Sequence, residues 1–256
     1  MLVLALDTAS VFCSAALAEN GHIIAARQDN IGTGHAEHLL QQIAALMRKA
    51  EKNFTQIDRI GVNIGPGSFT GIRIGVAAAR ALALALAKPA IGVSAFAALR
   101  AQAVAESGHK TVPAVYVVLQ ALQNGLYWQY FAANGDSSAP QSGTAEDIAA
   151  FMRHQPANEA QQTGRAQASL LIGSGAAGLA ALLPPQQAAC LRIAGSAPTA
   201  DIAFFAAAAA ELPAKAAAPV PLYMRAPAAQ PRKAELPAAE KSRAQAQYQN
   251  KKGGPV

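Results

Sequence analysis

Cysteine is scarce in this chain of 256 residues, which has only Cys13 and Cys190. Two isolated cysteines exclude a disulfide-rich scaffold and a zinc site made of closely spaced cysteine pairs, and they suit a reducing compartment. Aromatic residues are also few, at 5% of the chain, although 52% of its residues are hydrophobic. The core must therefore consist largely of small aliphatic side chains, and the length allows one large domain or two modest ones.

A targeting signal and long hydrophobic runs are missing as well. The first ten residues, MLVLALDTAS, contain no basic segment, and Asp7 interrupts their apolar run, which argues against a signal peptide. The longest apolar stretch, residues 72–87, contains Arg73 and Arg80 and is too short to cross a bilayer. We therefore expect a soluble, cytoplasmic protein that does not contact a membrane.

Acidic residues are outnumbered by basic ones, and the formal net charge is +6. The surplus is concentrated in residues 228–256, which hold Arg232, Lys233, Lys241, Arg243, Lys251 and Lys252 against Glu235 and Glu240. The basic balance is therefore mostly a property of this tail, and it is not evidence for an RNA-binding groove on the folded body. The tail has few apolar residues to bury, so we predict that residues 228–256 are disordered.

The hydrophobic pattern predicts an α/β protein with two related halves, residues 1–108 and 109–227. In the first half it indicates strands at 2–6, 12–18, 22–27, 57–64 and 90–93 and helices at 35–52, 72–87 and 94–107. The second half begins in the same way, with strands at 112–119, 126–132, 170–172 and 190–193 and helices from Thr144, at 176–183 and at 201–212. Each half starts with a hairpin around an Asn-Gly turn, and the second half is the smaller and less regular one.

Residues 65–75 read GPGSFTGIRIG, a glycine-rich loop before a helix. Such a loop can cradle a phosphate, or it can simply direct the helix that follows. It is not a nucleotide-hydrolysing loop, because it has no lysine, and the spacing of its glycines does not fit the dinucleotide-binding pattern. We favour the structural role, with a serine or threonine capping the helix. The residues of the alternative, an anion site, are Gly65, Gly67, Ser68, Thr70, Gly71 and Arg73.

Two further groups of polar residues could carry chemistry. Asp7 and Thr8 follow the first strand and could hold a hydrated magnesium ion or a phosphate, or could only cap a turn. His35 and His38 have the helical spacing of metal ligands, but no third ligand is evident nearby. A metal site needs three or four ligands, so two solvent-facing histidines at a helix start are favoured.

The helix at 72–87 is apolar nearly all round, which is typical of a helix buried on more than one side. One side must pack on the sheet of the protein itself, and we predict that the other side binds a partner. Small residues would let a partner helix approach closely. The predicted interface comprises Gly75, Ala78, Ala79, Leu82, Ala83 and Leu86. Periodicity alone does not decide which of these residues face outward.

Four stretches together resemble the TsaB (YeaZ) family. They are LALDT with CSAAL in residues 4–17, HAEHLL from His35, the glycine loop, and PLYMRAP from Pro221. The match covers residues 1–227, and the pattern GPGSFTG-x-R-x-G is its most specific part. The resemblance implies two ribonuclease H-like, actin-like halves, the fold of the sugar kinase, Hsp70 and actin superfamily. It also implies a role in adding the threonylcarbamoyl group to the adenosine beside the anticodon, position 37, of tRNAs that read codons starting with A.

The resemblance implies a non-catalytic subunit with no metal or cofactor of its own. Its partners would be a TsaD-like catalytic subunit, a paralogue that binds through helices of the N-terminal half, and a TsaE-like ATPase. The tRNA would be bound through the complex, and two copies of this chain could form a homodimer when the TsaD-like subunit is absent. Both paralogues have been grouped with glycoprotein endopeptidases, and the resemblance implies that this chain is an inactive peptidase-like homologue.

This sequence departs from the family pattern at Gln120, where many relatives have an aspartate. An acidic residue there could hold metal or phosphate opposite Asp7, and glutamine cannot carry that charge. A vestigial nucleotide site at Asp7 and Thr8 is therefore less expected here. The rival hypotheses are a kinase-like or peptidase-like enzyme that uses Asp7 with His35 and His38, and a tRNA-binding module that uses the basic tail.

Overall fold

The computed structural model describes residues 1–109, 111–121, 125–155, 168–213 and 219–224. The predicted tail at 228–256 lies outside the described residues, so its predicted disorder remains a prediction.

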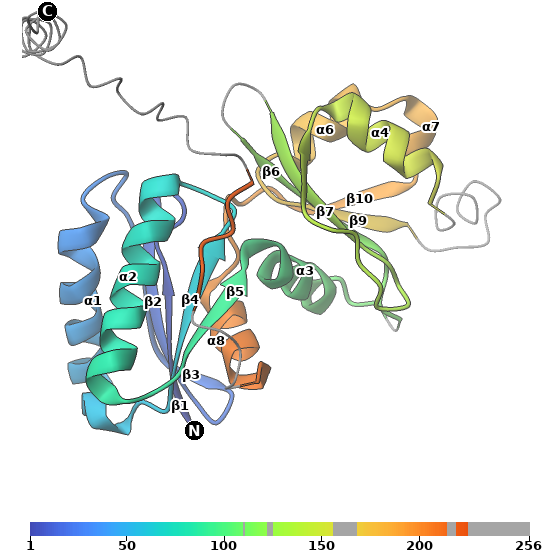
Figure 1. Cartoon of the computed structure of the whole chain (residues 1–256). Coiled ribbons are helices and arrows are strands. Elements are labelled where there is room, and N and C mark those ends of the chain that lie inside the picture. The colour runs from blue at the N-terminus through green and yellow to red at the C-terminus, as the bar shows by residue number, and fades with distance from the viewer. Residues whose placement is uncertain (110, 122–124, 156–167, 214–218, 225–256) are drawn as a thin grey trace, which may run out of the picture. The chain divides into compact units, whose positions relative to one another are not determined.

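The first sheet has five strands in the order β3-β2-β1-β4-β5 (Figure 1). These strands are β1 (Leu2–Asp7), β2 (Phe12–Glu19), β3 (His22–Asn30), β4 (Arg59–Gly65) and β5 (Ala90–Ser94). β1, β2 and β3 are antiparallel, whereas β4 and β5 run parallel to β1. The predicted hairpin is confirmed, because Asn20 and Gly21 both have positive φ at its turn.

The second sheet repeats this topology, since its order is β8-β7-β6-β9-β10 when it is followed from β8. Its strands are β6 (Val115–Gln120), β7 (Leu126–Phe131), β8 (Gln141–Gly143), β9 (Ser169–Ile172) and β10 (Leu191–Gly195). As in the first sheet, two antiparallel pairs are followed by two parallel pairs. The predicted fold class is confirmed as far as it describes an α/β protein with two related halves, each a mixed sheet with helices. The three-residue strand β8 was missed, because it is too short to show an alternating pattern.

The helices cover both faces of the first sheet. α1 (His35–Lys49) and α2 (Phe69–Leu86) pack on one face, over the alternating residues Leu2, Leu4 and Leu6 of β1 (Figure 1). α8 (Ile202–Glu211), which comes from the end of the described chain, packs on the other face. β1 is consequently buried on both sides, which explains its continuous apolar sequence.

The two sheets share one part of the core. α3 (Ala95–Glu106) follows the first sheet in the chain but also contacts β6, β7, β9 and β10 of the second sheet. Together with α8 it lies in a cluster that joins buried residues of both sheets. The second sheet packs on its other side against α4 (Ala145–Arg153), α6 (Ala176–Leu182) and α7 (Pro185–Ala188). A division of the sequence at residue 108 therefore does not separate two independent cores.

The last described segment, residues 219–224, returns to the first sheet. The backbone amide of Leu222 donates a hydrogen bond to the carbonyl of Ile64 at 2.7 Å, so this extended segment lies beside the end of β4. Figure 1 shows it in red next to β4 and the start of α2. The chain therefore ends its described part close to the glycine loop.

One helix in the described part of the chain, α2, is long and apolar enough to cross a membrane by length and composition. The sequence-based expectation that this stretch is too short was therefore wrong, because the helix begins three residues earlier than predicted, at Phe69. Its Ile72, Val76 and Ala79 pack into the core formed with β1 and β4. One side of α2 therefore belongs to the core of the folded body.

Candidate functional site

The start of α2 is determined by Ser68. Its hydroxyl accepts a hydrogen bond from the amide of Gly71 at 3.2 Å, which confirms the predicted helix cap. Ala, Leu and Ile then continue the helix over 18 residues until Ala87, which takes the left-handed conformation. The loop thus fixes where α2 begins.

The glycines of the loop are required by close packing against the segment after β1. A Cβ at Gly67 would overlap the carbonyl oxygen of Ala9, and a Cβ at Gly71 would overlap that of Thr8. Hydrogen bonds hold the two segments together: Ser68 N donates to Ala9 O at 2.7 Å, and the Thr8 hydroxyl donates to Gly71 O at 2.7 Å. The glycine-rich sequence is therefore explained by backbone contact within the chain.

Several loop amides that an anion site would need are already engaged. Gly65 N donates to Asn63 Oδ1 at 2.8 Å, and the amides of Ser68 and Gly71 donate as described above. Thr70 and Arg73 are exposed. These contacts favour the structural role of the loop over phosphate binding.

Asp7 lies at the end of β1 and is buried. Its Oδ1 accepts hydrogen bonds from Ala9 N at 2.8 Å and from Asn63 Nδ2 at 2.9 Å, and its Oδ2 accepts one from the Thr199 hydroxyl. Burial raises the pKa of the Asp7 carboxyl above its ordinary value, and the three hydrogen bonds oppose this rise. Both carboxylate oxygens of Asp7 and the hydroxyl of Thr8 are therefore engaged within the chain, and a vestigial nucleotide site at these residues stays a prediction.

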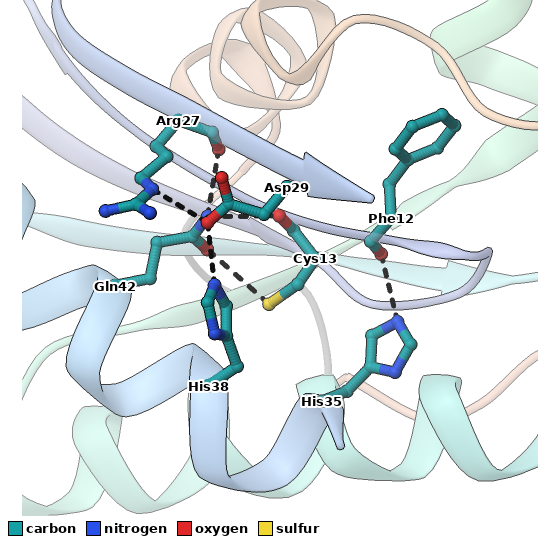
Figure 2. Close-up of polar contacts among 7 residues, drawn as sticks. All are labelled: Phe12, Cys13, Arg27, Asp29, His35, His38 and Gln42. Atoms are coloured by element: carbon teal, nitrogen blue, oxygen red, sulfur yellow. Dashed lines mark hydrogen bonds and ion pairs between the residues drawn. The ribbon is translucent and has the colours of Figure 1, made fainter. Parts of the chain in front are cut away.

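His35 and His38 occupy two different environments on α1, as Figure 2 shows. His35 is buried, and its Nε2 lies 3.2 Å from the carbonyl oxygen of Phe12, so the prediction of a solvent-facing side chain was wrong for it. His38 is partly exposed, and its Nε2 lies 2.6 Å from Asp29 Oδ2. The tertiary contacts with β2 and β3 turn these side chains toward the sheet instead of toward a common metal.

Asp29 is the centre of this polar cluster. Its Oδ2 also contacts Arg27 Nε at 2.7 Å and Gln42 Nε2 at 3.3 Å (Figure 2). The hydrogen bond from His38 holds the pKa of Asp29 below its ordinary value.

The neighbouring Cys13 is buried, which raises the pKa of its thiol to about 11. A thiol that stays protonated is a poor nucleophile. Among the described residues, no group of three or more His, Cys, Asp or Glu could hold a metal ion.

The outward surface of α2 is largely uncovered, since only five of its 18 residues are buried. Arg73, Ala77, Arg80, Ala81 and Leu84 are exposed along one side, and Leu84 has 86% of its surface exposed. Of the predicted interface residues, Ala78, Leu82, Ala83 and Leu86 are half-buried at the edges of this surface.

Two residues of the predicted interface have to be reassigned. Gly75 and Ala79 are buried on the sheet side of α2. Gly75 is there because a Cβ would come within 2.7 Å of the Thr8 hydroxyl oxygen. Their small size therefore serves packing within the chain and not the approach of a partner.

Tyr223 is a neighbour of α2 that the sequence did not reveal. Its ring lies 5.0 Å from the ring of Phe69, and its hydroxyl accepts a hydrogen bond from Arg73 Nε at 2.8 Å. The sequence around Tyr223 predicts an extended segment, but nothing in its pattern indicates which element it contacts.

Gln120, the position of the departure from the family pattern, makes its contact within the second half. Its backbone amide donates a hydrogen bond to Ser174 Oγ at 2.9 Å.

The family model described as "TsaD: tRNA N6-adenosine threonylcarbamoyltransferase" matches residues 29–250. The chain belongs to this family. Within it, the chain is a TsaB (YeaZ) homologue and a distant relative of TsaD. The resemblance seen in the sequence is thereby confirmed.

The relatives that carry a name agree with this position. The tRNA threonylcarbamoyladenosine biosynthesis protein TsaB of Escherichia coli K12 is 33% identical over 128 residues, which are 50% of this chain and 54% of that protein. The protein of the same name from Buchnera aphidicola of Acyrthosiphon pisum is 26% identical over 53% of this chain and 60% of its own length. This chain thus spans about half the length of the curated relatives that it matches.

A solved structure supports the fold. YeaZ from Pseudomonas aeruginosa superposes with a TM-score of 0.67 and 23% sequence identity, over 87% of this chain and 99% of that structure. At this identity the likeness concerns the fold alone.

Proposed function

We propose that this chain is a non-catalytic subunit of the machinery that adds the threonylcarbamoyl group to adenosine 37 of tRNAs reading codons that start with A. Its role is to bind and activate a TsaD-like catalytic subunit. The observation that carries the proposal is the outward surface of α2, which leaves a long apolar helix of a TsaB homologue uncovered along one side. This side combines the 86% exposed Leu84 with two arginines and the exposed ring of Phe69, and arginine and aromatic side chains are enriched at protein interfaces.

The chemistry of the candidate residues supports a non-catalytic role. Asp7 is enclosed by three hydrogen-bond donors, and His35 and His38 contact different groups of the protein. A catalytic acid, base or nucleophile has to reach a substrate, whereas Asp7 and His35 are buried and His38 is bound to Asp29. The proposal therefore assigns no metal, cofactor or catalytic residue to this chain.

The remaining partners follow from the family. A TsaE-like ATPase joins the pair, the tRNA is brought by the complex, and a second copy of this chain occupies α2 when the catalytic subunit is absent. The proposal places the assembly in the cytoplasm, where tRNA is modified.

Substitution of Leu84 by arginine tests the proposal directly. Leu84→Arg should abolish binding to the TsaD-like protein of the same organism, because a charge enclosed in an apolar interface without a counter-ion costs on the order of several kcal/mol. Leu182→Arg is the matched control, since Leu182 is also on a helix and is 72% exposed but belongs to α6 of the second half. Binding measured by calorimetry should be lost only in the first variant. Equal affinities for both variants and the wild type would refute the proposal.

The rival enzymatic function has its own test. ATP hydrolysis or peptide cleavage by the purified chain, lost in Asp7→Ala, would contradict the non-catalytic role. Neither activity is expected, because the glycine loop has no lysine to neutralise phosphates and its amides are engaged within the chain.

A further inference from the structure

Phe69, Arg73 and Tyr223 form an exposed cluster, here called the aromatic–arginine cluster, at the N-terminal end of α2. The Arg73 guanidinium carbon lies 3.9 Å from the centre of the Phe69 ring and 5.7 Å from that of Tyr223. The two rings are 5.0 Å apart, and Arg73 Nε donates to the Tyr223 hydroxyl at 2.8 Å. Phe69 and Tyr223 are 38% and 40% exposed. Two segments separated by 150 residues thus meet at the surface.

The cluster is positively charged, and its charge is not balanced. No ion pair among the described residues involves Arg73, and the first turn of α2 contains no acidic residue. The amides at the start of a helix add a partial positive charge to that of the guanidinium. An exposed site with this charge is complementary to a carboxylate.

The guanidinium is also held in place before any partner arrives. The face of Phe69 and the Tyr223 hydroxyl restrict Arg73, and its Nε is the nitrogen that binds Tyr223. The two terminal nitrogens form the fork that pairs with a carboxylate through two parallel hydrogen bonds. An arginine that is already ordered loses less conformational entropy on binding.

The aromatic–arginine cluster is continuous with the outward surface of α2. Arg73, Ala77, Arg80 and Leu84 follow one another at intervals of four, three and four residues, which places them on one side of the helix. Tyrosine, phenylalanine and arginine are also enriched at protein interfaces. A partner that lies along α2 therefore reaches Arg73.

We propose that the aromatic–arginine cluster binds an acidic side chain of the same protein partner that docks on the outward surface of α2. This inference rests on the proposed function. The cluster extends the apolar contact with one oriented ion pair, which fixes the direction of the partner along the helix. Tyr223 acts as a positioning residue for Arg73, so the returning segment 219–224 contributes to the interface.

Arg73→Glu tests the proposal in nuclease-treated proteins, with affinity and association rate measured at low and at moderate salt. We expect the variant to bind the TsaD-like partner at least about tenfold more weakly, with a slower association that depends less on salt. Tyr223→Phe keeps the ring but removes the hydroxyl, and should weaken binding by about threefold. Arg153→Glu is the control, because Arg153 is exposed in the last turn of α4, and its affinity should equal that of the wild type.

The outcomes separate the two proposals. If Arg73→Glu and its milder form Arg73→Gln bind the partner as tightly as the wild type while Leu84→Arg does not bind, the cluster proposal is refuted and the proposed function stands. If Leu84→Arg binds normally, the proposed function fails. Unchanged partner binding with weaker retention of tRNA in Arg73→Glu would assign the guanidinium to a phosphate, and it would also overturn the cluster proposal.

Discussion

The side chains of Asp7 and Thr199 are joined by a hydrogen bond inside the protein, although 192 residues separate them in the sequence. Asp7 ends β1 of the first sheet, and Thr199 precedes α8, the helix that returns to that sheet. Asp7 also binds Asn63, whose Oδ1 accepts from Gly65 of the glycine loop at 2.8 Å. One buried carboxylate therefore connects the first strand, the glycine loop and the start of α8.

Thr199→Val should destabilise the protein, because it removes a hydrogen bond from a buried carboxylate without removing the carboxylate. The expected loss in the free energy of unfolding is about 1–3 kcal/mol at neutral pH. Thr199→Ser keeps the hydroxyl and is the control. Denaturation with urea measures the difference, and equal stability of Val and Ser variants would show that the bond contributes nothing.

The effect of Thr199→Val should also depend on pH. The folded-state pKa of Asp7 is already raised by burial, and loss of the Thr199 bond raises it further. A carboxyl with a raised folded pKa loses stability as the pH increases from its unfolded value, 3.8, through its folded value. The variant should therefore be closest to the wild type in acid and fall behind it as the pH rises to neutral. A difference that stays constant over this range would contradict the assignment of the raised pKa to Asp7.

Gly71→Ala should be strongly destabilising, because the added methyl group would overlap the carbonyl oxygen of Thr8. We expect a loss of at least about 1–3 kcal/mol, as for other substitutions that overpack a buried contact. Gly178→Ala is a matched control within α6, where nothing lies within 4 Å of the added atom. The control should be neutral or up to about 1 kcal/mol more stable, since alanine favours a helix. Thermal melting of both variants decides the comparison.

These contacts show how far the sequence could predict the glycine loop. The pattern predicted a cap at Ser68 or Thr70, of which Ser68 is the one observed, and it favoured the structural role, because both depend on neighbours within a few residues. The reason for the glycines is a close approach to Thr8 and Ala9, some 60 residues earlier, and spacing gives no information about that approach. The same limit applies to Thr199, which lies two residues before Asp201 and shows no sequence signal for a contact with β1. Asp201 caps α8, and Thr199 binds Asp7.

The outward side of α2 could have been predicted from the positions of its two arginines. Arg73 and Arg80 are seven residues apart, which is close to two helical turns, so they share one side of α2. Charged side chains favour solvent, so this side is expected to face outward. That side includes Leu84 but not Gly75 or Ala79. The predicted interface was based on small residue size and not on the side of α2 that carries the arginines. It therefore included Gly75 and Ala79, which are buried. The contact with Tyr223 had no comparable signal.

His38→Ala should raise the pKa of Asp29 toward its ordinary value, because the hydrogen bond from His38 is the main cause that lowers it. A lowered carboxyl pKa stabilises the fold above the unfolded value, 3.8, and this contribution is lost as the pH falls through the folded value. The variant should therefore lose stability at neutral pH and lose less on acidification than the wild type. The Asp29 carboxyl resonance followed by NMR gives the pKa directly. His22→Ala, at an exposed position of β3, should leave it unchanged.

Removal of residues 228–256 should leave the body folded, because this segment has few apolar side chains to contribute to a core. The melting temperature should fall by less than about 4 °C, which corresponds to roughly 1 kcal/mol for a chain of this size. A larger fall would show that the tail packs on the body. If the tail instead contacts tRNA, truncation should weaken RNA binding by the complex and reduce its dependence on salt, because each phosphate contact contributes to that dependence.

An arginine scan along α2 should separate its two sides. Ala79→Arg should unfold the protein, because Ala79 is fully buried against the sheet and an unpaired charge cannot be accommodated there. Ala77→Arg and Ala81→Arg are on the exposed side and should change the free energy of unfolding by less than about 0.5 kcal/mol. The half-buried Ala78 and Ala83 should fall between these limits. Circular dichroism and thermal melting establish the folded state of each variant before its affinity for the TsaD-like protein is measured. The two exposed-side variants should remain folded and lose the partner, and a partner that binds both of them as tightly as the wild type would have to dock elsewhere.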